Sequence, residues 1–395
     1  MKKRILFIIP SLAAGGAEKS LLNLLRELDY SRYDADLMLF QREGLFLSDV
    51  PEAVNILDAG EEYLYFDGSI GGCLLYCLKK IKPLLALKRI LYALSLRKKE
   101  SVNKRRTVWK YLSSVLPETE LNYDFAVGYL EGNSIYYCVE KVRASKKAGY
   151  IHSDYSKLLL NPEFDREFLL KLDFIMTVSE ACAESLVNVF PYLLEKIKVV
   201  ENIISSSEIK RLSTLGPGFP EAAKGIKLLT VGRLSPEKGI DLALEACELL
   251  TRRGIDFIWA VVGGGSEAEP IAEKAKSKSL EARFILLGEQ KNPYGYLAQC
   301  DIYVQPSRYE GKSIAVEEAK LAAKPVVVTR YSTVNDQIED SVSGLIAEMN
   351  PQSIAEKILM LIENPSLMNK LSRNLTESSA NYISGAENLY ELIED

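Results

Sequence analysis

Short apolar runs alternate with longer amphipathic stretches along most of this sequence. Residues 4–9 (RILFII) form the first run, and a glycine-bearing turn and an amphipathic helix through LLNLLREL follow it. Buried strands that alternate with helices indicate a parallel sheet covered on both faces. The predicted strands of the first half are 4–9, 34–40, 125–130, 147–152, 174–179 and 196–200.

The same pattern restarts at residue 226 with a strand, a polar loop and the helical stretch IDLALEACELLTRRG. A segment rich in Ser, Gly and Pro, residues 203–225, separates the two series. The pattern predicts two Rossmann-like, doubly wound α/β domains, at 1–204 and 205–375, and a C-terminal helix in 376–395 that packs back toward the first domain. The predicted strands of the second series are 226–232, 257–263, 284–288, 302–306, 325–329 and 344–348.

The composition is that of a folded two-domain protein, with 395 residues of which 47% are apolar and 26% charged. A formal net charge of −5 argues against general affinity for nucleic acid. No run approaches the roughly 18 apolar residues that indicate a membrane-spanning helix. Six scattered cysteines favour reduced thiols in a cytoplasmic protein over a metal-binding set.

Chemically distinctive residues gather in the segment PSRYEGKSIAVEEAKLAAKPVVVT. A predicted strand leads into a loop with Glu310, and Glu318 lies in the second turn of the helix that follows. Free backbone N–H groups of Gly311, Lys312 and Ser313 are expected to form a helix N-terminus suited to a phosphate. Because ligands of open parallel sheets bind beyond the carboxyl ends of the strands, these residues are expected in a cleft between the two domains.

A second distinctive segment, VGRLSPEKGID, follows the first strand of the second series. Gly232 ends this strand, so Arg233 is expected to point into the cleft, and Lys238 precedes the next helix. Cations fixed at this place would suit a negatively charged ligand such as a phosphate group. The alternative is a pair of surface cations in a helix-entry loop.

The first segment resembles the E-x7-E signature of glycosyltransferase family 4, and the second resembles that family's diphosphate-binding segment. The resemblance implies the two-domain GT-B fold, a nucleotide-sugar donor and retention of the anomeric configuration. It also implies that Glu310 contacts hydroxyls of the donor sugar and that Glu318 binds the ribose. Arg233 and Lys238 would then bind the diphosphate.

The resemblance extends to weaker positions in both halves of the chain. His152, the only histidine, follows a predicted strand where the family carries a histidine that contacts the C6 hydroxyl of the donor sugar. Gly16 lies in a loop that in the family closes over the donor phosphate, and Gly263 resembles a turn near the nucleotide. Asp154 and Glu131 are expected on the acceptor side.

Lys312 and Ser313 stand where the family usually has Phe-Gly, so the sugar pocket is expected to differ in shape. Both are expected to contact the donor, as are Gly232 and Gly311. The sequence shows no cluster of metal ligands. Enzymes with this fold generally hold the diphosphate with cations and helix dipoles, so the resemblance implies neither a metal nor a cofactor beyond the nucleotide-sugar co-substrate.

Residues 79–110 hold twelve Lys or Arg and a single acid, mixed with leucines and aromatic side chains. A basic amphipathic helix of this kind binds an anionic membrane surface. The alternative is a helix that covers the core of the first domain and keeps its basic face in water. The sequence leaves both possibilities open.

The expected activity is transfer of a hexose or N-acetylhexosamine from a nucleotide sugar, with UDP as the first choice, to a saccharide or lipid-linked acceptor in surface polysaccharide synthesis. The expected location is the cytoplasm or the inner face of the plasma membrane. Two alternatives remain open, a UDP-sugar 2-epimerase and a non-catalytic accessory subunit that binds sugar nucleotides.

Overall fold

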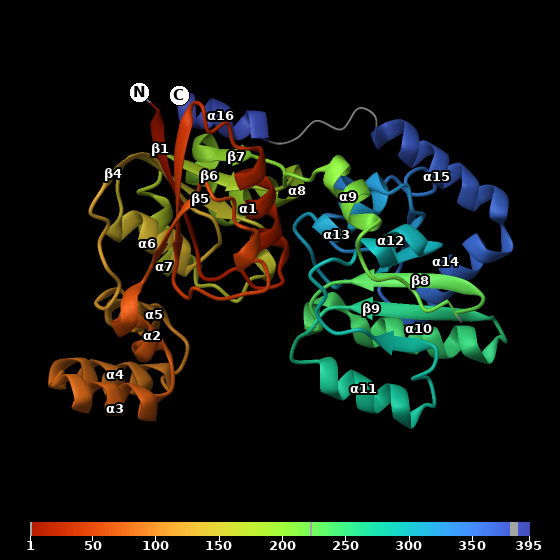
Figure 1. The fold of residues 1–395 in the computed structure, drawn as a ribbon, viewed down its shortest axis with the longest axis horizontal. Helices are drawn as coiled ribbons and strands as arrows, with labels where there is room; N and C mark the ends of the chain where they lie inside the picture. The colour runs from red at the N-terminus through yellow and green to blue at the C-terminus, as the bar shows by residue number, and fades with distance from the viewer. Residues whose placement is uncertain (1, 222, 380–385) are drawn as a thin grey trace.

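A computed structural model of the chain describes residues 2–221, 223–379 and 386–395. They form two α/β domains that lie side by side, each built around one parallel sheet (Figure 1). The N-terminal sheet has seven strands in the order β3-β2-β1-β4-β5-β6-β7, and the C-terminal sheet has six in the order β10-β9-β8-β11-β12-β13. In both sheets the strand numbers fall toward the first strand of the domain, β1 or β8, and rise again on its other side, as in a Rossmann fold.

The N-terminal domain has strands β1 Lys3–Ile9, β2 Tyr33–Leu39, β3 Asn55–Asp58, β4 Asn122–Gly128, β5 Arg143–Ile151, β6 Phe174–Thr177 and β7 Ile197–Val199. Its helices are α1 Gly16–Glu27, α2 Gly60–Asp67, α3 Ile70–Lys80, α4 Pro83–Leu96, α5 Val102–Ser113, α6 Asn133–Lys141, α7 Pro162–Leu169 and α8 Glu180–Val189. Short 3-10 turns are η1 Leu47–Asp49, η2 Tyr155–Lys157 and η3 Pro191–Lys196.

The C-terminal domain has strands β8 Ile226–Val231, β9 Phe257–Val262, β10 Phe284–Leu286, β11 Ile302–Gln305, β12 Val326–Thr329 and β13 Leu345–Ala347. Its helices are α9 Ser206–Ser213, α10 Ile240–Arg252, α11 Ala268–Ser277, α12 Tyr294–Gln299, α13 Ile314–Leu321, α14 Pro351–Glu363 and α15 Pro365–Ser379. The 3-10 turns are η4 Pro236–Lys238 and η5 Val334–Asp336, and a last helix, α16, spans Ala386–Glu394.

Strand β1 shows why apolar runs become central strands here. Its side chains alternate between two buried clusters, with Leu6 and Ile8 on one face of the sheet and Ile5, Phe7 and Ile9 on the other. Helices cover both faces, so every position of the run from Ile5 onward can be apolar. The twelve predicted strands all appear in the structure with slightly shifted ends, and β3 is an addition.

The last helix, α16, returns to the N-terminal domain, where it lies beside β1 (Figure 1). Leu389, Leu392 and Ile393 are buried in the same cluster as one face of the N-terminal sheet. The Tyr390 ring stacks on Tyr33 with centroids 5.4 Å apart. Residues 376–379 belong to helix α15, and the chain from 380 to 385 lies outside the described residues.

The basic segment 79–110 is divided among three helices instead of forming one. Helix α3 ends at Lys80, α4 begins at Pro83, and α5 spans Val102–Ser113. No helix among the described residues is long and apolar enough to cross a membrane. All six cysteines are buried free thiols.

Candidate functional site

One cavity of about 420 Å³ lies between the two domains and collects most of the predicted site residues. The first turn of α1 and the loops after β4 and β5 contribute from the N-terminal domain. The loops after β8 and β9 and the start of α13 contribute from the C-terminal domain. Of the thirteen predicted residues, twelve line the cavity: Gly16, Glu131, His152, Gly232, Arg233, Lys238, Gly263, Glu310, Gly311, Lys312, Ser313 and Glu318.

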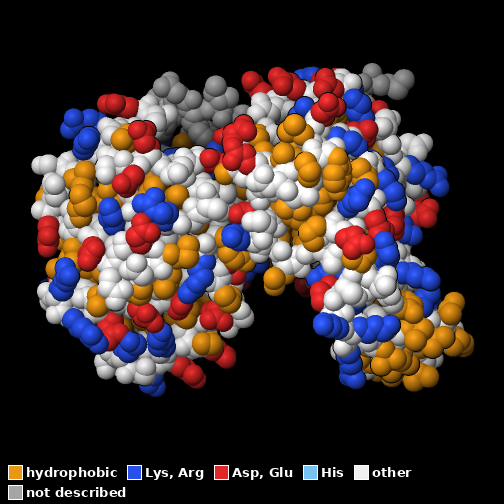
Figure 2. All heavy atoms as spheres, turned by 180° about the vertical axis from the view of Figure 1, so that it is seen from behind, with side chains coloured by type: hydrophobic (Ala, Val, Ile, Leu, Met, Phe, Trp, Pro, Cys, Tyr) orange, Lys and Arg blue, Asp and Glu red, His pale blue; other side chains and the backbone are white. Residues whose placement is uncertain are grey.

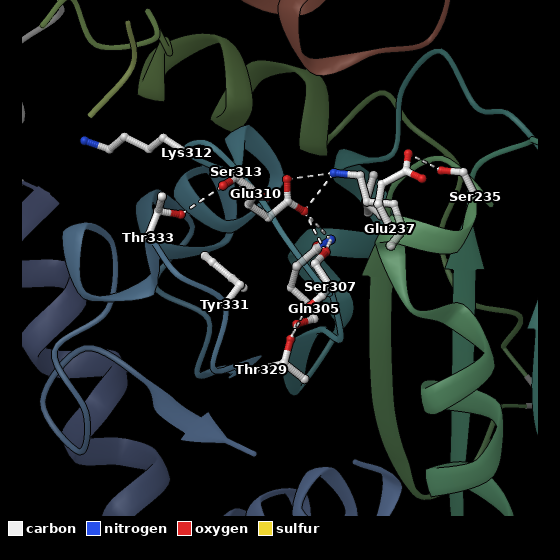
Figure 3. Close-up of polar contacts among 12 residues, drawn as sticks. Ser235, Glu237, Gln305, Ser307, Glu310, Lys312, Ser313, Thr329, Tyr331 and Thr333 are labelled. Atoms are coloured by element: carbon white, nitrogen blue, oxygen red, sulfur yellow. Dashed lines mark hydrogen bonds and ion pairs between the residues drawn. The ribbon is translucent and has the colours of Figure 1, made fainter. Parts of the chain in front are cut away.

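Glu310 is the most heavily bonded carboxylate at this site, and it is 8% exposed. Lys238 donates to both of its oxygens, at 2.7 and 2.8 Å. Ser307 Oγ donates to Oε1 at 2.6 Å, and Gln305 Nε2 lies 3.3 Å from the same oxygen. Both side chains point toward Glu310 from the end of strand β11 (Figure 3). These contacts fix the orientation of the carboxylate within the protein itself. A carboxylate that recognises specific hydroxyl groups needs such a fixed orientation.

Glu318 is 3% exposed and binds groups from both domains. Lys19 of helix α1 forms an ion pair with its Oε1 at 2.7 Å, and the Tyr294 hydroxyl donates to the same oxygen at 2.7 Å. The Lys19 ammonium also lies 4.4 Å from the centre of the Tyr294 ring. Sequence reasoning did not select Lys19 or Tyr294. A lysine in the first turn of an amphipathic helix gives no signal that it reaches a second domain.

His152 lies at the carboxyl end of β5 and is held in a neutral form. Burial lowers the pKa of its imidazole from the usual 6.5 to about 4. Its Nε2 lies 3.1 Å from the Tyr129 carbonyl oxygen, and its ring stacks on Tyr150 with centroids 4.0 Å apart. Because a carbonyl oxygen only accepts, Nε2 carries the proton of the neutral ring, and Nδ1 is left as an acceptor for a hydroxyl group.

Two further glutamates line the cavity on its N-terminal side. Glu131 accepts the His152 backbone N–H at 3.2 Å, and burial raises the pKa of its carboxyl. Burial also raises the pKa of Glu18, while the charge of Arg233 across the cleft opposes this rise. Arg233 is itself exposed and extends from the end of β8 into the cavity. In this part of the cleft, carboxyl groups of the N-terminal domain therefore face a cation of the C-terminal domain.

The two domains touch through their backbones at Gly311. A Cβ atom placed on Gly311 would lie 2.0 Å from the His152 carbonyl oxygen, a separation that side chains cannot adopt. A Cβ on Gly263, where φ is +148°, would lie 1.9 Å from the Gly232 carbonyl oxygen. Glycine at these positions lets four loops of the cavity wall approach one another in two pairs.

The start of helix α13 differs from the expectation in one respect. The Ser313 N–H is not free, because it donates to Gln337 Oε1 at 2.9 Å, and Gln337 Nε2 returns a bond of 2.8 Å to the Ser313 carbonyl. Of the three N–H groups that were predicted to bind a phosphate, at most those of Gly311 and Lys312 are left for an anion. The Lys312 side chain extends away from Glu310 (Figure 3) and pairs with Glu201 at 2.6 Å.

Asp154 is the predicted site residue that does not line the cavity. It is 3% exposed, and hydroxyl groups of Ser156, Ser185 and Ser332 donate to its carboxylate at 2.7, 2.6 and 2.7 Å. Ser332 belongs to the C-terminal domain, so these bonds link the two domains. The geometry gives Asp154 this linking position and offers no support for the acceptor contact that was expected of it.

Among the described residues, no group of three or more His, Cys, Asp or Glu side chains could hold a metal ion. The strongest acidic positions, Glu310 and Glu318, are each bonded by a lysine ammonium.

Comparison with known proteins supports the fold and the class of the C-terminal domain. Residues 218–378 match the family model described as Glycosyl transferases group 1. The chain is 18% identical to the Anabaena protein HepE, solved in complex with UDP and glucose, with a TM-score of 0.70 and 99% of both chains covered. The GT-B fold expected from the sequence is thereby confirmed.

Several curated relatives resemble half of the chain or less. A poly(ribitol-phosphate) alpha-N-acetylglucosaminyltransferase of Staphylococcus aureus is 29% identical over 201 residues, which are 50% of this chain and 38% of that protein. An N-acetylgalactosaminyltransferase of Campylobacter jejuni, named for a diphospho-undecaprenol substrate, is 28% identical over 50% of this chain and 53% of that protein. This chain therefore spans about half or less of the length of the curated relatives it matches.

Proposed function

We propose that this protein is a retaining glycosyltransferase that moves a hexose or N-acetylhexosamine from a UDP-sugar to a saccharide or lipid-linked acceptor. The observation that carries the proposal is the meeting of Glu310, Glu318, Arg233, Lys238 and His152 in one interdomain cavity. The match of residues 218–378 to glycosyl transferases group 1 supports the class, and the UDP-bound fold relative supports the choice of nucleotide.

The C-terminal side of the cavity suits the donor. Glu318 would accept ribose hydroxyls, and Glu310, fixed by Lys238 and Ser307, would accept hydroxyls of the sugar. Arg233 and Lys238 would face the diphosphate, whose charge grows as the bond from the anomeric carbon to the diphosphate oxygen breaks. Cations fixed before the reaction stabilise this charge without reorganisation during the step.

The N-terminal side suits the acceptor and the exclusion of water. His152 and Glu131 line the cavity opposite Glu310, and the contact at Gly311 closes the wall between them. In the proposed step the acceptor oxygen bonds to the anomeric carbon from the face that the diphosphate leaves. The acceptor proton passes to the departing diphosphate. Because the new bond forms on the face from which the diphosphate leaves, the anomeric configuration is retained. Six buried thiols are compatible with the reducing cytoplasm as the location.

The proposal is tested first by calorimetric binding of UDP, GDP, ADP and their common sugar conjugates in the presence of EDTA. Selective binding of the UDP compounds, lost in Glu318→Gln and kept in the matched surface variant Glu245→Gln, is the expected result. Release of UDP should then require an acceptor, and nuclear magnetic resonance of the product reports its anomeric configuration.

Three outcomes would contradict the proposal. Donor binding without turnover on any acceptor would favour an accessory subunit. Conversion of the donor to its C2 epimer without an acceptor would identify an epimerase. A product of inverted configuration would reject retention while leaving sugar transfer in place.

A further inference from the structure

Helices α3 and α4 form a hairpin at the end of the N-terminal domain farthest from helix α16 (Figure 1). Its inner face packs on the domain through Cys73, Tyr76 and Cys77 of α3 and through Leu85 and Arg89 of α4, all buried. The Arg89 guanidinium donates to the Gly68 carbonyl at 2.7 Å, which fixes α4 against the end of α2. The hairpin is therefore a supported part of the fold and not a loose extension.

The outer face of the hairpin is apolar. On α4 the exposed side chains Leu84, Leu87, Leu91 and Leu94 recur at intervals of three and four residues, which places them on one side of the helix. Leu75 and Leu78 of α3 and Ile81 of the connecting turn extend this surface, and the last two are 77% and 86% exposed. We call these seven residues the apolar tip.

Exposed hydrophobic side chains are concentrated around the apolar tip. Of the 21 large hydrophobic side chains that are exposed among the described residues, twelve lie between positions 64 and 96. Figure 2 shows a patch of hydrophobic side chains at the projecting end of the domain, with Lys and Arg side chains between this patch and the hollow that separates the two domains. Patches of this kind mark contact with another apolar phase or partner.

Ile81 gives a second, independent indication of such a contact. Its backbone is left-handed, with φ of +55°, and a β-branched residue adopts this conformation at a cost that Gly or Asn avoids. The side chain gains nothing in return within the fold, since it is 86% exposed. An apolar environment outside the chain would account for isoleucine at the apex of the turn.

The charge around the tip indicates which environment this is. Residues 70–99 contain eight Lys or Arg and no acidic residue. Lys80 and Lys82 lie near Glu61 and Glu62. The other exposed or half-buried cations form no ion pair with any residue that the structure describes: Lys79, Lys88, Arg97, Lys98 and Lys99.

We propose that the apolar tip inserts into the interface of an anionic lipid bilayer while the flanking lysines and arginines contact lipid phosphates. Apolar burial and attraction to anionic headgroups act together in interfacial binding. Because the hairpin projects from the domain, a flat membrane surface can reach its leucines. The absence of acidic residues from 70–99 favours contact with a negatively charged surface. This surface stands independently of the proposed sugar transfer.

The structure also relocates the surface that the sequence suggested for 79–110. Three of the four cations of α5 already form ion pairs, because Lys104 and Arg105 share Glu100 and Arg106 pairs with Glu167, and among the described residues only Lys110 of this helix forms none. Trp109 is buried and donates to Glu140. The proposed membrane surface therefore lies on α3, α4 and the residues just after them, and α5 attaches the hairpin to the domain.

Sedimentation of the full chain with lipid vesicles tests the proposal. Vesicles of equal parts phosphatidylglycerol and phosphatidylcholine should bind the protein, pure phosphatidylcholine vesicles should bind it far less, and added salt should weaken the binding. The double variant Leu78→Asn/Ile81→Asn should reduce binding by at least about tenfold. The matched control Leu215→Asn changes a leucine that is 67% exposed on the other domain and should leave binding unchanged.

The variant also separates membrane binding from folding. Asparagine accepts the left-handed backbone of position 81, so Ile81→Asn alone should keep or raise the melting temperature while vesicle binding falls. UDP binding by both variants should equal that of the parent protein. Failure of the parent protein to bind anionic vesicles, or unchanged binding of the double variant, would overturn the proposal. Dimerisation in ultracentrifugation that the same variant abolishes would assign the tip to a second copy instead.

Discussion

Glu310 shows how much of the site is organised by single side chains. It is buried, it carries a bidentate contact with Lys238, and two polar groups of β11 and its loop hold it from the other side. A buried ion pair of this kind is weak evidence for stability, because desolvation offsets most of its Coulombic gain. Its arrangement is better explained by the chemistry of the cleft than by the needs of the fold.

Replacing either member of this pair should therefore affect catalysis more than folding. Lys238→Ala and Glu310→Gln should each lower kcat/KM by at least about a hundredfold, the scale of losing one electrostatic contact to the transition state. The free energy of unfolding should fall by about 1–3 kcal/mol, because the remaining partner keeps only some of its bonds. Steady-state kinetics and chemical denaturation measure the two effects.

The matched control is Lys274→Ala, which breaks the Lys274–Glu245 pair on the surface of the same domain, where both side chains are about two-fifths exposed. That variant should change neither quantity appreciably. Parent-like turnover of both cleft variants would remove Glu310 and Lys238 from the mechanism.

His152 offers a direct test of its environment because it is the only histidine in the chain. In untagged protein its imidazole protons should give one set of resonances that titrates near pH 4, well below the ordinary value of 6.5. The free energy of unfolding should also depend on pH, in a direction that the pKa shift determines. The unfolded chain binds a proton below about pH 6.5 and the folded chain only near pH 4, so stability is lost as the pH falls through this window.

The variant His152→Gln should remove that part of the pH dependence, so that the difference in melting temperature between the two proteins changes between pH 6.5 and pH 4. A titration midpoint near 6.5 in the folded protein would show that the ring is solvated and would contradict its placement.

The sequence predicted residues whose roles follow from local patterns and missed those that act across the cleft. Glu310 and Lys238 stand beside strand ends and glycines, so their position was readable. Lys19 reaches Glu318 only because helix α1 faces helix α13 across the cleft. Asp154 follows a strand end as a ligand residue would, yet it bonds to serines of both domains. A packing interface between distant segments leaves no spacing signal for either residue.

At the scale of elements, the loop before α13 fixes the distance between the domains. Gly311→Ala should prevent the present approach, because its Cβ would overlap the His152 carbonyl oxygen. We expect kcat/KM to fall by about a hundredfold or more, since a wider cleft misplaces groups of one domain against those of the other. Small-angle scattering should show a larger radius of gyration.

Gly16→Ala is the matched comparison for the scattering measurement. It lies on the facing wall, and its Cβ would meet only the Ile314 side chain at 3.7 Å, an ordinary contact. Its radius of gyration should stay that of the parent protein. An unchanged radius for Gly311→Ala as well would mean that the loop yields and the contact does not set the spacing.

Elements were predictable where burial imposed a pattern. Eleven of the twelve expected strands contain buried residues and read as apolar runs, and the edge strand β7 is the exception. Strand β3, NILD, has no fully buried residue, so its four positions carry no such pattern. The basic segment was read as one stretch because its composition is uniform. A left-handed Ile81 and Pro83 at the first helical position divide it, and backbone conformation of this kind is not visible in composition.

At the scale of the whole molecule, α16 joins the end of the described chain to its beginning. Lys3, Arg32 and Tyr33 all contact Glu394, whose carboxyl pKa is lowered to about 2, mainly by the Lys3 hydrogen bond. Removing residues 386–395 would expose the N-terminal core that Leu389, Leu392 and Ile393 cover. We expect a loss of several kcal/mol, on the order of 1.5–3 kcal/mol for each aliphatic side chain.

Thermal and chemical unfolding of the truncated chain measure this loss. Tyr390→Phe is the matched small change in the same helix. It removes only the hydroxyl that bonds to the Asp29 N–H and the Glu27 carbonyl, and it should lower the free energy of unfolding by about 1 kcal/mol. Full stability of the truncated protein would show that α16 is an appendage instead of part of the domain.

The return of α16 also has a consequence for biosynthesis. The N-terminal sheet is complete once residue 199 has been made, yet one of its apolar faces waits for side chains that the ribosome adds almost two hundred residues later. Synthesis at about 5–20 residues per second makes that delay on the order of ten seconds or more. During this time the C-terminal domain folds while its neighbour still shows an uncovered patch, and the nascent chain is a natural client for a chaperone.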